Sequence, residues 1–274
     1  MDFKTAKTII DNLLNTNNKY HTENIKGIVL EFIGGEPLLE IELIDRIITY
    51  FINECIRLNH RFLHRFKISM TSNGLLYFTD SVQNFIKKYK DKLSYTITID
   101  GNKQLHDACR FDLDGNGTYD RVVSAVTHLR NNYIPTLNTK MTLSPDNIHY
   151  TFEAIKNLIE LNYQFIFLNC VFEEGWELKH AKILYNEMKK TADWLFENDS
   201  FKKYKISIFE ENSFISLPET ETNNWCGGVC NGMLAFDYNG KAFPCIRYMG
   251  SSLNGHQEPY SVGDIDGLFI TEED

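Results

Sequence analysis

Residues 27–39, Gly-Ile-Val-Leu-Glu-Phe-Ile-Gly-Gly-Glu-Pro-Leu-Leu, decide the fold of this chain. The almost wholly apolar run over 28–33 is typical of a parallel strand that is covered on both faces. Pro37 is tolerated in the first turn of a helix, and the two glycines allow backbone groups to approach a ligand closely. The stretch therefore predicts a strand, a tight turn and a helix start, with a small-molecule site at the end of the strand. An ordinary strand-to-helix turn is the alternative that the glycine pair alone favours.

Strand-like and helix-like stretches alternate through most of the chain. Apolar residues at helical spacing predict helices over 5–15, 37–60, 79–90, 118–131, 147–161 and 178–197. Apolar runs between them predict strands over 67–73, 93–99, 136–143 and 164–171, and a short one over 204–209. Such alternation indicates the α/β fold class, with a parallel sheet and right-handed crossovers.

Composition excludes several classes of function. The 274 residues are 43% apolar and 24% charged, which suits a soluble globular protein with a substantial core. A net charge of −9 without a Lys/Arg-rich arm argues against nucleic acid as a partner. No apolar run approaches the roughly 18 residues that a membrane span requires. The first five residues lack the apolar core of a secretory signal, so we expect a cytoplasmic protein.

Small polar residues follow two more of the predicted strands. Thr-Ser-Asn-Gly stands at 71–74, and Thr-Ile-Asp-Gly stands at 98–101. Because the carboxyl ends of parallel strands meet at one edge of a sheet, we expect these turns to converge. The candidate ligand-binding residues are Gly34, Gly35, Glu36, Ser72, Asn73, Thr98, Asp100 and Arg110. The structural alternatives are a helix-terminal charge for Glu36 and an ordinary strand-end turn for Asn73.

The cysteines form a second candidate site. Six cysteines in a chain without a secretory signal are better explained as ligands or buried thiols than as disulfides. Cys226 and Cys230 are separated by three residues in a glycine-rich turn, and Cys245 follows a predicted hairpin with an Asn-Gly turn. This spacing fits thiolate ligation of a metal. A zinc site completed by an outside ligand such as His256 is the structural alternative.

Taken in this order, the motifs resemble radical S-adenosylmethionine (SAM) enzymes that carry a SPASM-type auxiliary-cluster domain, the group that modifies ribosomal peptides and sulfatases. Residues 34–37 match the G-G-E-P motif of that group, 71–74 its T-S-N-G motif and 98–101 its S-x-D-G motif. The resemblance implies a partial (β/α)6 TIM-like barrel over 1–200 that lacks its first strand unit. It also implies a small Cys-rich β-hairpin extension, a partial SPASM domain, over 201–274.

The resemblance also implies where SAM binds. Residues 34–36 would meet the SAM amino group, largely through backbone atoms, and residues 72–73 would lie beside the ribose. Thr98 would take the place of a family serine near the methionyl carboxylate, in the same motif as Asp100. Arg110 would supply a charge-assisted bond to that carboxylate, because a guanidinium matches carboxylate geometry.

Two departures from the family pattern concern iron–sulfur clusters. The auxiliary [4Fe-4S] cluster implied for Cys226, Cys230 and Cys245 takes a further cysteine from downstream, and the sequence has none before Asp274. The C-x-x-x-C-x-x-C triplet that holds the catalytic cluster is also absent. In the family that triplet precedes the segment that resembles residues 1–14. We therefore expect a chain that begins at an internal methionine and is catalytically incomplete.

The resemblance implies the activity and the partners of the full-length relative. It would use SAM and [4Fe-4S] clusters to abstract hydrogen from a Cys-containing, ribosomally made precursor peptide, with flavodoxin or ferredoxin as a possible electron donor. Two alternatives from other classes stay open at this point. One is a non-catalytic SAM- or peptide-binding protein, and the other is a zinc-bearing structural domain.

Overall fold

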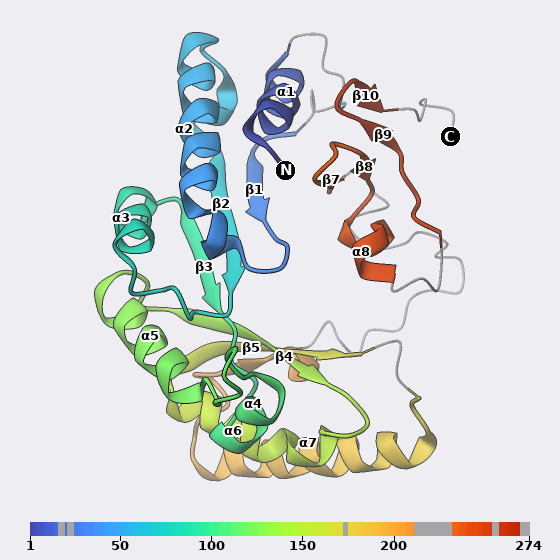
Figure 1. The fold of residues 1–274 in the computed structure, drawn as a ribbon. Coiled ribbons are helices and arrows are strands. Elements are labelled where there is room, and N and C mark those ends of the chain that lie inside the picture. The colour runs from blue at the N-terminus through green and yellow to red at the C-terminus, as the bar shows by residue number, and fades with distance from the viewer. Residues whose placement is uncertain (16–19, 21–24, 172–174, 211–231, 254–257, 269–274) are drawn as a thin grey trace. The chain divides into compact units, whose positions relative to one another are not determined.

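The computed structural model describes residues 1–15, 20, 25–171, 175–210, 232–253 and 258–268 (Figure 1). Its parallel strands are β1 (Ile28–Phe32), β2 (Phe66–Ser72), β3 (Leu93–Ile97), β4 (Leu137–Leu143), β5 (Tyr163–Cys170) and β6 (Lys205–Ile206). The helices among and before them are α1 (Phe3–Leu14), α2 (Ile41–Arg57), α3 (Asp80–Tyr89), α4 (Lys103–Cys109), α5 (Tyr119–Asn132), α6 (Thr151–Glu160) and α7 (Leu178–Glu197). The α/β fold class predicted from the sequence is confirmed.

Backbone contacts divide the chain into two compact units that interleave in the sequence. The first unit comprises residues 1–30, 42–67 and 217–274, and the second comprises 31–41 and 68–216. Every predicted SAM-site residue lies in the second unit. The boundaries of these two units differ from the domain boundary predicted near residue 200. The division into a barrel over 1–200 and a Cys-rich extension over 201–274 therefore stays a prediction.

Parallel pairing organises the longer strands of the chain. The strands form one sheet with the order β1-β2-β3 and another with the order β4-β5-β6. β2 and β3 pair in parallel, so that Ser72 lies opposite Ile97. β4, β5 and β6 also pair in parallel. Between the sheets, Thr96 Oγ1 on β3 donates to Asn138 Oδ1 on β4 at 2.8 Å. Within each sheet, the carboxyl ends of the paired strands therefore lie at one edge.

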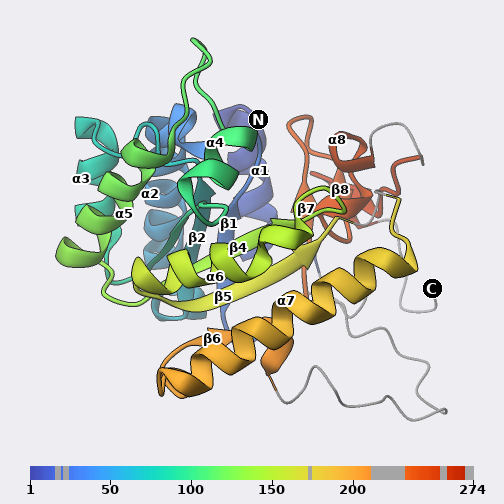
Figure 2. The same cartoon turned by 90° about the horizontal axis from the view of Figure 1, so that it is seen from below.

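β4 shows the alternation expected of a strand with one covered face. Its buried residues are Leu137, Thr139, Met141 and Leu143, and its exposed residues are Asn138, Lys140 and Thr142. Figure 2 shows α6 and α7 on one side of the β4-β5-β6 sheet. The buried residues of β4 face that side, whereas its exposed residues face away from the helices.

A buried carboxylate joins the two covering helices. Glu187 on α7 is 5% exposed, and its Oε2 accepts from the backbone N–H of Phe152 at the start of α6 at 3.1 Å. Lys190 Nζ donates to Glu187 Oε1 at 2.5 Å. The Glu187 carboxylate is therefore satisfied, which is the condition for burying a charge at low cost. α7 itself begins with a capping box between Glu177 and His180.

The first unit contains α1, most of α2 and a small antiparallel sheet. That sheet has the order β10-β9-β8-β7, with the strands β7 (Ala235–Phe236), β8 (Ala242–Phe243), β9 (Gly263–Asp264) and β10 (Gly267–Leu268). The turn between β7 and β8 is closed by a hydrogen bond from Gly240 N to Asp237 O at 3.0 Å. Asn12 on α1 donates to the carbonyl of Ile265, which ties the helix to this sheet.

The structure differs from the predicted elements in three places. β1 is not covered on both faces, because Val29 is 60% exposed and Glu31 on the same side is also exposed. α4 was not predicted, because its seven residues are too few to show a periodic apolar face. The strand predicted over 204–209 is reduced to the two residues of β6 and is followed by the 3-10 turn Ser207–Phe209. Within the described ranges, no helix is both long and apolar enough to span a bilayer.

Candidate functional site

A carboxylate links the first two predicted motifs. Glu36 Oε2 accepts from the backbone N–H of Asn73 at 2.8 Å, and Glu36 Oε1 accepts from Leu38 N at 3.0 Å. The second bond caps the 3-10 turn Pro37–Glu40, as the helix-terminal interpretation of Glu36 expects. The first bond does more, because it fixes the turn after β1 against the turn after β2. The Glu36 side chain therefore both caps a helix and builds the site.

The glycine pair leaves its backbone open. Gly34 has a φ of 149°, a conformation that residues with a side chain rarely adopt. A Cβ atom built on Gly34 or Gly35 would meet no described atom within 4 Å. Both glycines are exposed. The space beside the glycine backbone is therefore accessible to a ligand, and only the conformation of Gly34 demands glycine.

Ser72 and Asn73 occupy different environments. Ser72 is 3% exposed, and its Oγ accepts from Gly74 N at 2.8 Å and from the Tyr95 hydroxyl at 3.2 Å. Burial raises the pKa of that Tyr95 hydroxyl, so it remains a hydrogen-bond donor at neutral pH. Asn73 is half-buried, and its Oδ1 accepts from Leu75 N at 2.9 Å. The Ser72 side chain supports the turn after β2 from its buried side. Asn73 is more exposed to solvent than Ser72.

The third motif contributes an ion pair. Arg110 Nε donates to Asp100 Oδ2, with the Asp100 side chain 12% exposed and the Arg110 side chain 34% exposed. Asp100 Oδ1 is buried, and no described atom bonds to it. Thr98 N donates to Ser72 O at 2.9 Å, which continues the pairing of β2 and β3 beyond their ends. The Thr98 side chain is half-buried. The three predicted motifs therefore lie side by side.

A buried histidine holds this third turn. His106 on α4 is 0% exposed, and its Nδ1 accepts from the Asp100 N–H at 3.3 Å. Its Nε2 lies 3.1 Å from Thr118 Oγ1, which donates to Arg110 O at 3.1 Å. This order of donors places the proton of a neutral imidazole on Nε2. Burial, and next the nearby Arg110 charge, lower the pKa of His106, so the ring stays neutral.

No role was predicted from the sequence for His106, Thr118 or Tyr95. Their contribution depends on the fold, because His106 bonds to the turn before α4 while Thr118 follows a long loop. Thr118 is also 3% exposed. One signal was available in the sequence: His106 lies between Asp100 and Arg110, two residues that were already candidates.

The structure tests little of the predicted metal site. Cys226 and Cys230 lie outside the described residues. Cys245 follows β8, is 6% exposed and is a free thiol. Within the described part of the chain, no cluster of three or more His, Cys, Asp or Glu side chains is arranged to hold a metal ion. The predicted cysteine ligands therefore stay a prediction.

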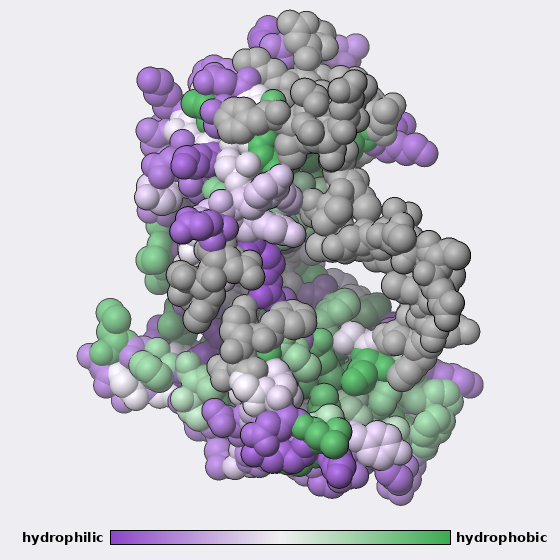
Figure 3. Space-filling model, turned by 90° about the vertical axis from the view of Figure 1, so that its right-hand side faces the viewer, coloured by the Kyte–Doolittle hydropathy of each residue, from purple (hydrophilic) through white to green (hydrophobic). Residues whose placement is uncertain are grey.

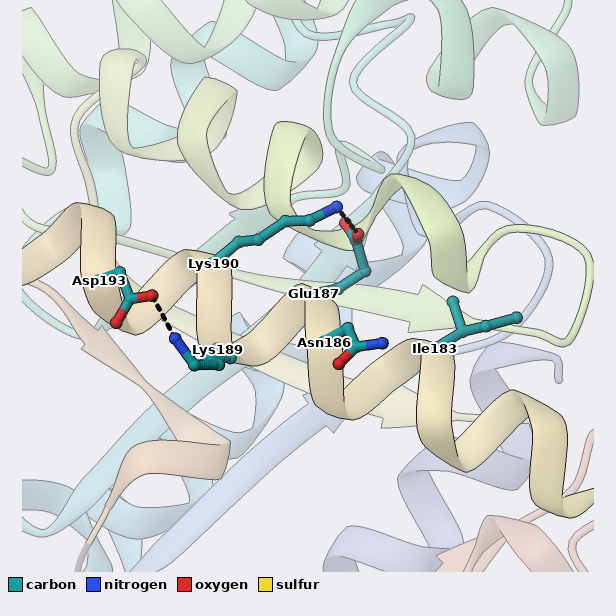
Figure 4. A pocket seen from close by; sticks show the side chains of 6 residues that line it. All are labelled: Ile183, Asn186, Glu187, Lys189, Lys190 and Asp193. Carbon is teal, nitrogen blue, oxygen red and sulfur yellow. Dashed lines mark hydrogen bonds and ion pairs between the residues drawn. The ribbon is translucent and has the colours of Figure 1, made fainter.

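A shallow hollow on the outer side of α7 contains none of the predicted site residues (Figure 4). Its volume is about 390 Å³, and its lining residues are Ile183, Asn186, Glu187, Lys189, Lys190 and Asp193. The charges in it are already paired, Lys190 with Glu187 and Lys189 with Asp193 at 2.7 Å. Nothing in this hollow points to a ligand, and the converging turns remain the candidate site.

Parallel sheets with polar turns converging at the carboxyl ends of adjacent strands define a class of α/β proteins that bind small ligands at that edge. Comparison with known proteins identifies the relatives as radical SAM enzymes and confirms the resemblance predicted from the sequence. A cysteine-type anaerobic sulfatase-maturating enzyme of Clostridium perfringens is 23% identical over 253 residues, which cover 88% of this chain and 63% of the relative. The radical SAM cyclopropyl synthase TigE of Paramaledivibacter caminithermalis is 27% identical over 274 residues, which cover 96% of this chain and 50% of TigE.

Solved structures show the same fold. The structure of anSMEcpe with bound AdoMet matches with a TM-score of 0.71 at 17% identity, covering 100% of this chain and 70% of that one. Streptococcus suis SuiB bound to S-adenosylmethionine matches with a TM-score of 0.58 at 14% identity, and the match covers 97% of this chain and 57% of SuiB. No protein-family model matches the chain. The chain spans less than two thirds of the length of both curated relatives.

Proposed function

We propose that the turns after β1, β2 and β3 bind SAM, and that the chain is the SAM-binding part of an enzyme that modifies a Cys-containing peptide. One observation carries the proposal: the Glu36 carboxylate bonds to the backbone of Asn73 and so joins two of the three motifs. An ordinary strand-end turn needs no such bond to its neighbour. The third motif is attached through the bond from Thr98 N to Ser72 O.

The residues present fit SAM. The open backbone at Gly34 and Gly35 suits the ammonium group of SAM, because carbonyl oxygens accept from it. Arg110 uses only its Nε for Asp100, so its terminal nitrogens are directed to no described partner and suit the methionyl carboxylate. Asn73 and Thr98, both half-buried, lie between these two ends, where the ribose would bind. Ser72 positions Asn73 from beneath.

The chemistry of the site divides between the cofactor and the chain. SAM, once bound and reduced, supplies hydrogen-atom abstraction. Asp100 holds the Arg110 guanidinium in place, and neutral His106 fixes the turn that carries Asp100. The printed sequence has no C-x-x-x-C-x-x-C triplet, so the reduction of SAM is assigned to none of its residues.

The finer features of the fold belong to the same proposal. The two parallel sheets would be consecutive arcs of a partial (β/α)6 barrel, joined through β3 and β4. The fold shared with anSMEcpe and SuiB supports this arrangement. Cys226, Cys230 and Cys245 would hold an auxiliary [4Fe-4S] cluster in a SPASM-like segment. A peptide substrate is supported by neighbours solved with the Cp18Cys peptide and with the precursor peptide SuiA.

Calorimetric titration with SAM tests the nucleotide site. Glu36→Gln replaces an acceptor with an amide that cannot accept from both Leu38 N and Asn73 N, so we expect SAM affinity to fall about tenfold. Glu153→Gln on the exposed start of α6 is the matched control and is expected to bind like the parent. Equal affinities for the parent and Glu36→Gln would remove the turns from the site.

Anaerobic reconstitution with iron and sulfide tests the cysteine site. We expect broad visible absorbance and bound iron in the parent, and loss of both in Cys245→Ser, because a cluster needs its thiolates. Cys55→Ser is the control, since Cys55 is a fully buried residue of α2 and burial raises its pKa to about 11. Tight binding of zinc without iron uptake would replace the cluster with a zinc site.

A further inference from the structure

The open face of the β4-β5-β6 sheet carries an unusual set of side chains. Parallel register places Asn138 beside Phe165, and Lys140 beside Phe167, on the face that points away from α6 and α7. The same register places Lys205 beside Phe165. Two lysines therefore flank two phenylalanines across three strands. We call Lys140, Phe165, Phe167 and Lys205 the aromatic–basic strip.

The strip is exposed where most sheet faces of a folded domain are covered. Lys140 and Lys205 are exposed, Phe165 is half-buried and Phe167 is 49% exposed. Figure 3 shows apolar side chains gathered in the lower half of that view. A phenylalanine left half in water costs free energy that a partner recovers by covering it. The strip therefore has the character of a binding surface.

Within the described residues, the two lysines of the strip have no carboxylate partner. Among the described residues, Lys140 has no carboxylate partner, and Lys205 Nζ contacts only the Phe165 ring, 5.7 Å from its centroid. The chain as a whole carries a net charge of −9. Two lysines beside aromatic rings, without a carboxylate partner in the described part of this negatively charged chain, favour an acidic partner.

We propose that the aromatic–basic strip binds an extended acidic segment of the peptide substrate, with one carboxylate at Lys140, a second at Lys205 and an apolar residue over the phenylalanines. The proposal rests on the peptide-modifying function proposed above and specifies its substrate. Lys140 on β4 and Lys205 on β6 are separated by the intervening strand β5 and are offset by two residues along it. Their backbones are therefore about 12 Å apart. Four residues of extended peptide span about 13 Å and place every second side chain on one face. The expected pattern is acidic-x-apolar-x-acidic.

Fluorescence anisotropy with three labelled synthetic peptides tests the proposal on the full chain. The first contains Glu-Ser-Leu-Ser-Glu between Gly-Ser flanks, the second has Gln for both Glu residues, and the third has the two Glu residues adjacent. We expect the spaced acidic peptide to bind at least fivefold more tightly than the other two. The preference should disappear in the double variant Lys140→Gln, Lys205→Gln. It should persist in the control Lys182→Gln, Lys189→Gln on α7.

Each outcome decides the matter. Equal binding of the three peptides by the parent, binding of none at millimolar concentration, or a preference that survives the double variant would overturn the proposal. A calorimetric SAM titration of the same samples separates it from the proposed function. If the parent keeps the peptide preference but does not bind SAM, the strip stands and the SAM function fails. If Lys140→Gln alone abolishes SAM binding, Lys140 belongs to the SAM site and the proposal fails.

Discussion

Two regions of one unit carry charged side chains but differ in how those charges are satisfied: the turns after β1, β2 and β3, and the open face of β4, β5 and β6. In the turns, Glu36 accepts from two backbone N–H groups and Asp100 pairs with Arg110. On the open face, Lys140 has no carboxylate partner among the described residues. The first region is arranged before a ligand arrives, whereas the second leaves its charges available.

This contrast indicates two modes of recognition. A preorganised network gives up little side-chain entropy when it binds, which suits a small cofactor of fixed shape. Free lysine side chains adapt to a partner and favour rapid electrostatic encounter, which suits a flexible peptide. The two regions should therefore respond differently to substitution: the turns through stability and SAM affinity, and the open face through peptide binding alone.

The largest effect is expected at Gly101. Its φ is 85°, and a built Cβ would lie 2.4 Å from Ala154 Cβ on α6. Gly101→Ala should cost about 3 kcal/mol in urea unfolding, because backbone strain and a steric clash add. Gly115 is a matched control, with a φ of 81° and open space around it. If Gly115→Ala costs as much as Gly101→Ala, the packing of this turn against α6 is unimportant.

The Asp100–Arg110 pair should show an intermediate effect. Asp100→Asn removes the charge that holds the partly exposed Arg110 guanidinium. We therefore expect the free energy of unfolding to fall by about 1–2 kcal/mol after allowance for solvent screening. SAM affinity should fall about tenfold in the same variant, since one tenfold step corresponds to about 1.4 kcal/mol. Asp193→Asn breaks an exposed pair with Lys189 and serves as the control. Unaltered SAM binding by Asp100→Asn would contradict a binding role for Arg110.

The sequence predicted the first of the two regions better than the second. Residues 34–36, 71–74 and 98–101 are local motifs, so their positions at strand ends followed from the alternation of strands and helices. The bond between Glu36 and Asn73 spans 37 residues and required the sheet order. His106 escaped assignment because its partners Asp100 and Thr118 are set by the fold.

The open face was beyond sequence analysis for a further reason. Lys140 and Phe167 become neighbours only through the parallel register of β4 and β5. That register contains an irregularity between Leu137 and Asn138. A shift of one residue reverses the face that a side chain occupies, so no pattern within β5 alone assigns Phe167 to the open side.

His106 should give a smaller, pH-dependent effect. In the folded state, burial and the Arg110 charge lower the pKa of His106. The contribution of neutral His106 to stability is therefore complete above the ordinary histidine pKa, near 6.5, and is lost as the pH falls through the folded pKa. When the pH falls from 7.5 to 5.5, the free energy of unfolding of the parent should decrease by about 1 kcal/mol more than that of His106→Gln. Urea unfolding at both pH values measures this. The exposed His149→Gln should follow the parent, and identical pH profiles for the parent and His106→Gln would show that His106 is not buried neutral.

The smallest effect on stability is expected on the open face. Lys140→Gln should change the free energy of unfolding by less than about 0.5 kcal/mol, because an exposed and unpaired lysine contributes little to the folded state. Thermal denaturation of Lys140→Gln and the parent tests this. A loss comparable to that of Asp100→Asn would mean that Lys140 has a partner within the protein, and the contrast between the two regions would disappear.

Hydrogen–deuterium exchange with and without SAM tests the central claim most directly. The converging turns should gain protection at 33–36, 72–75 and 98–101 when SAM is added, because these backbone groups would contact or order around the ligand. The strands β4 and β5 should change little. Protection confined to β4 and β5, or SAM binding without protection of any of the three turns, would contradict a SAM site built from these motifs.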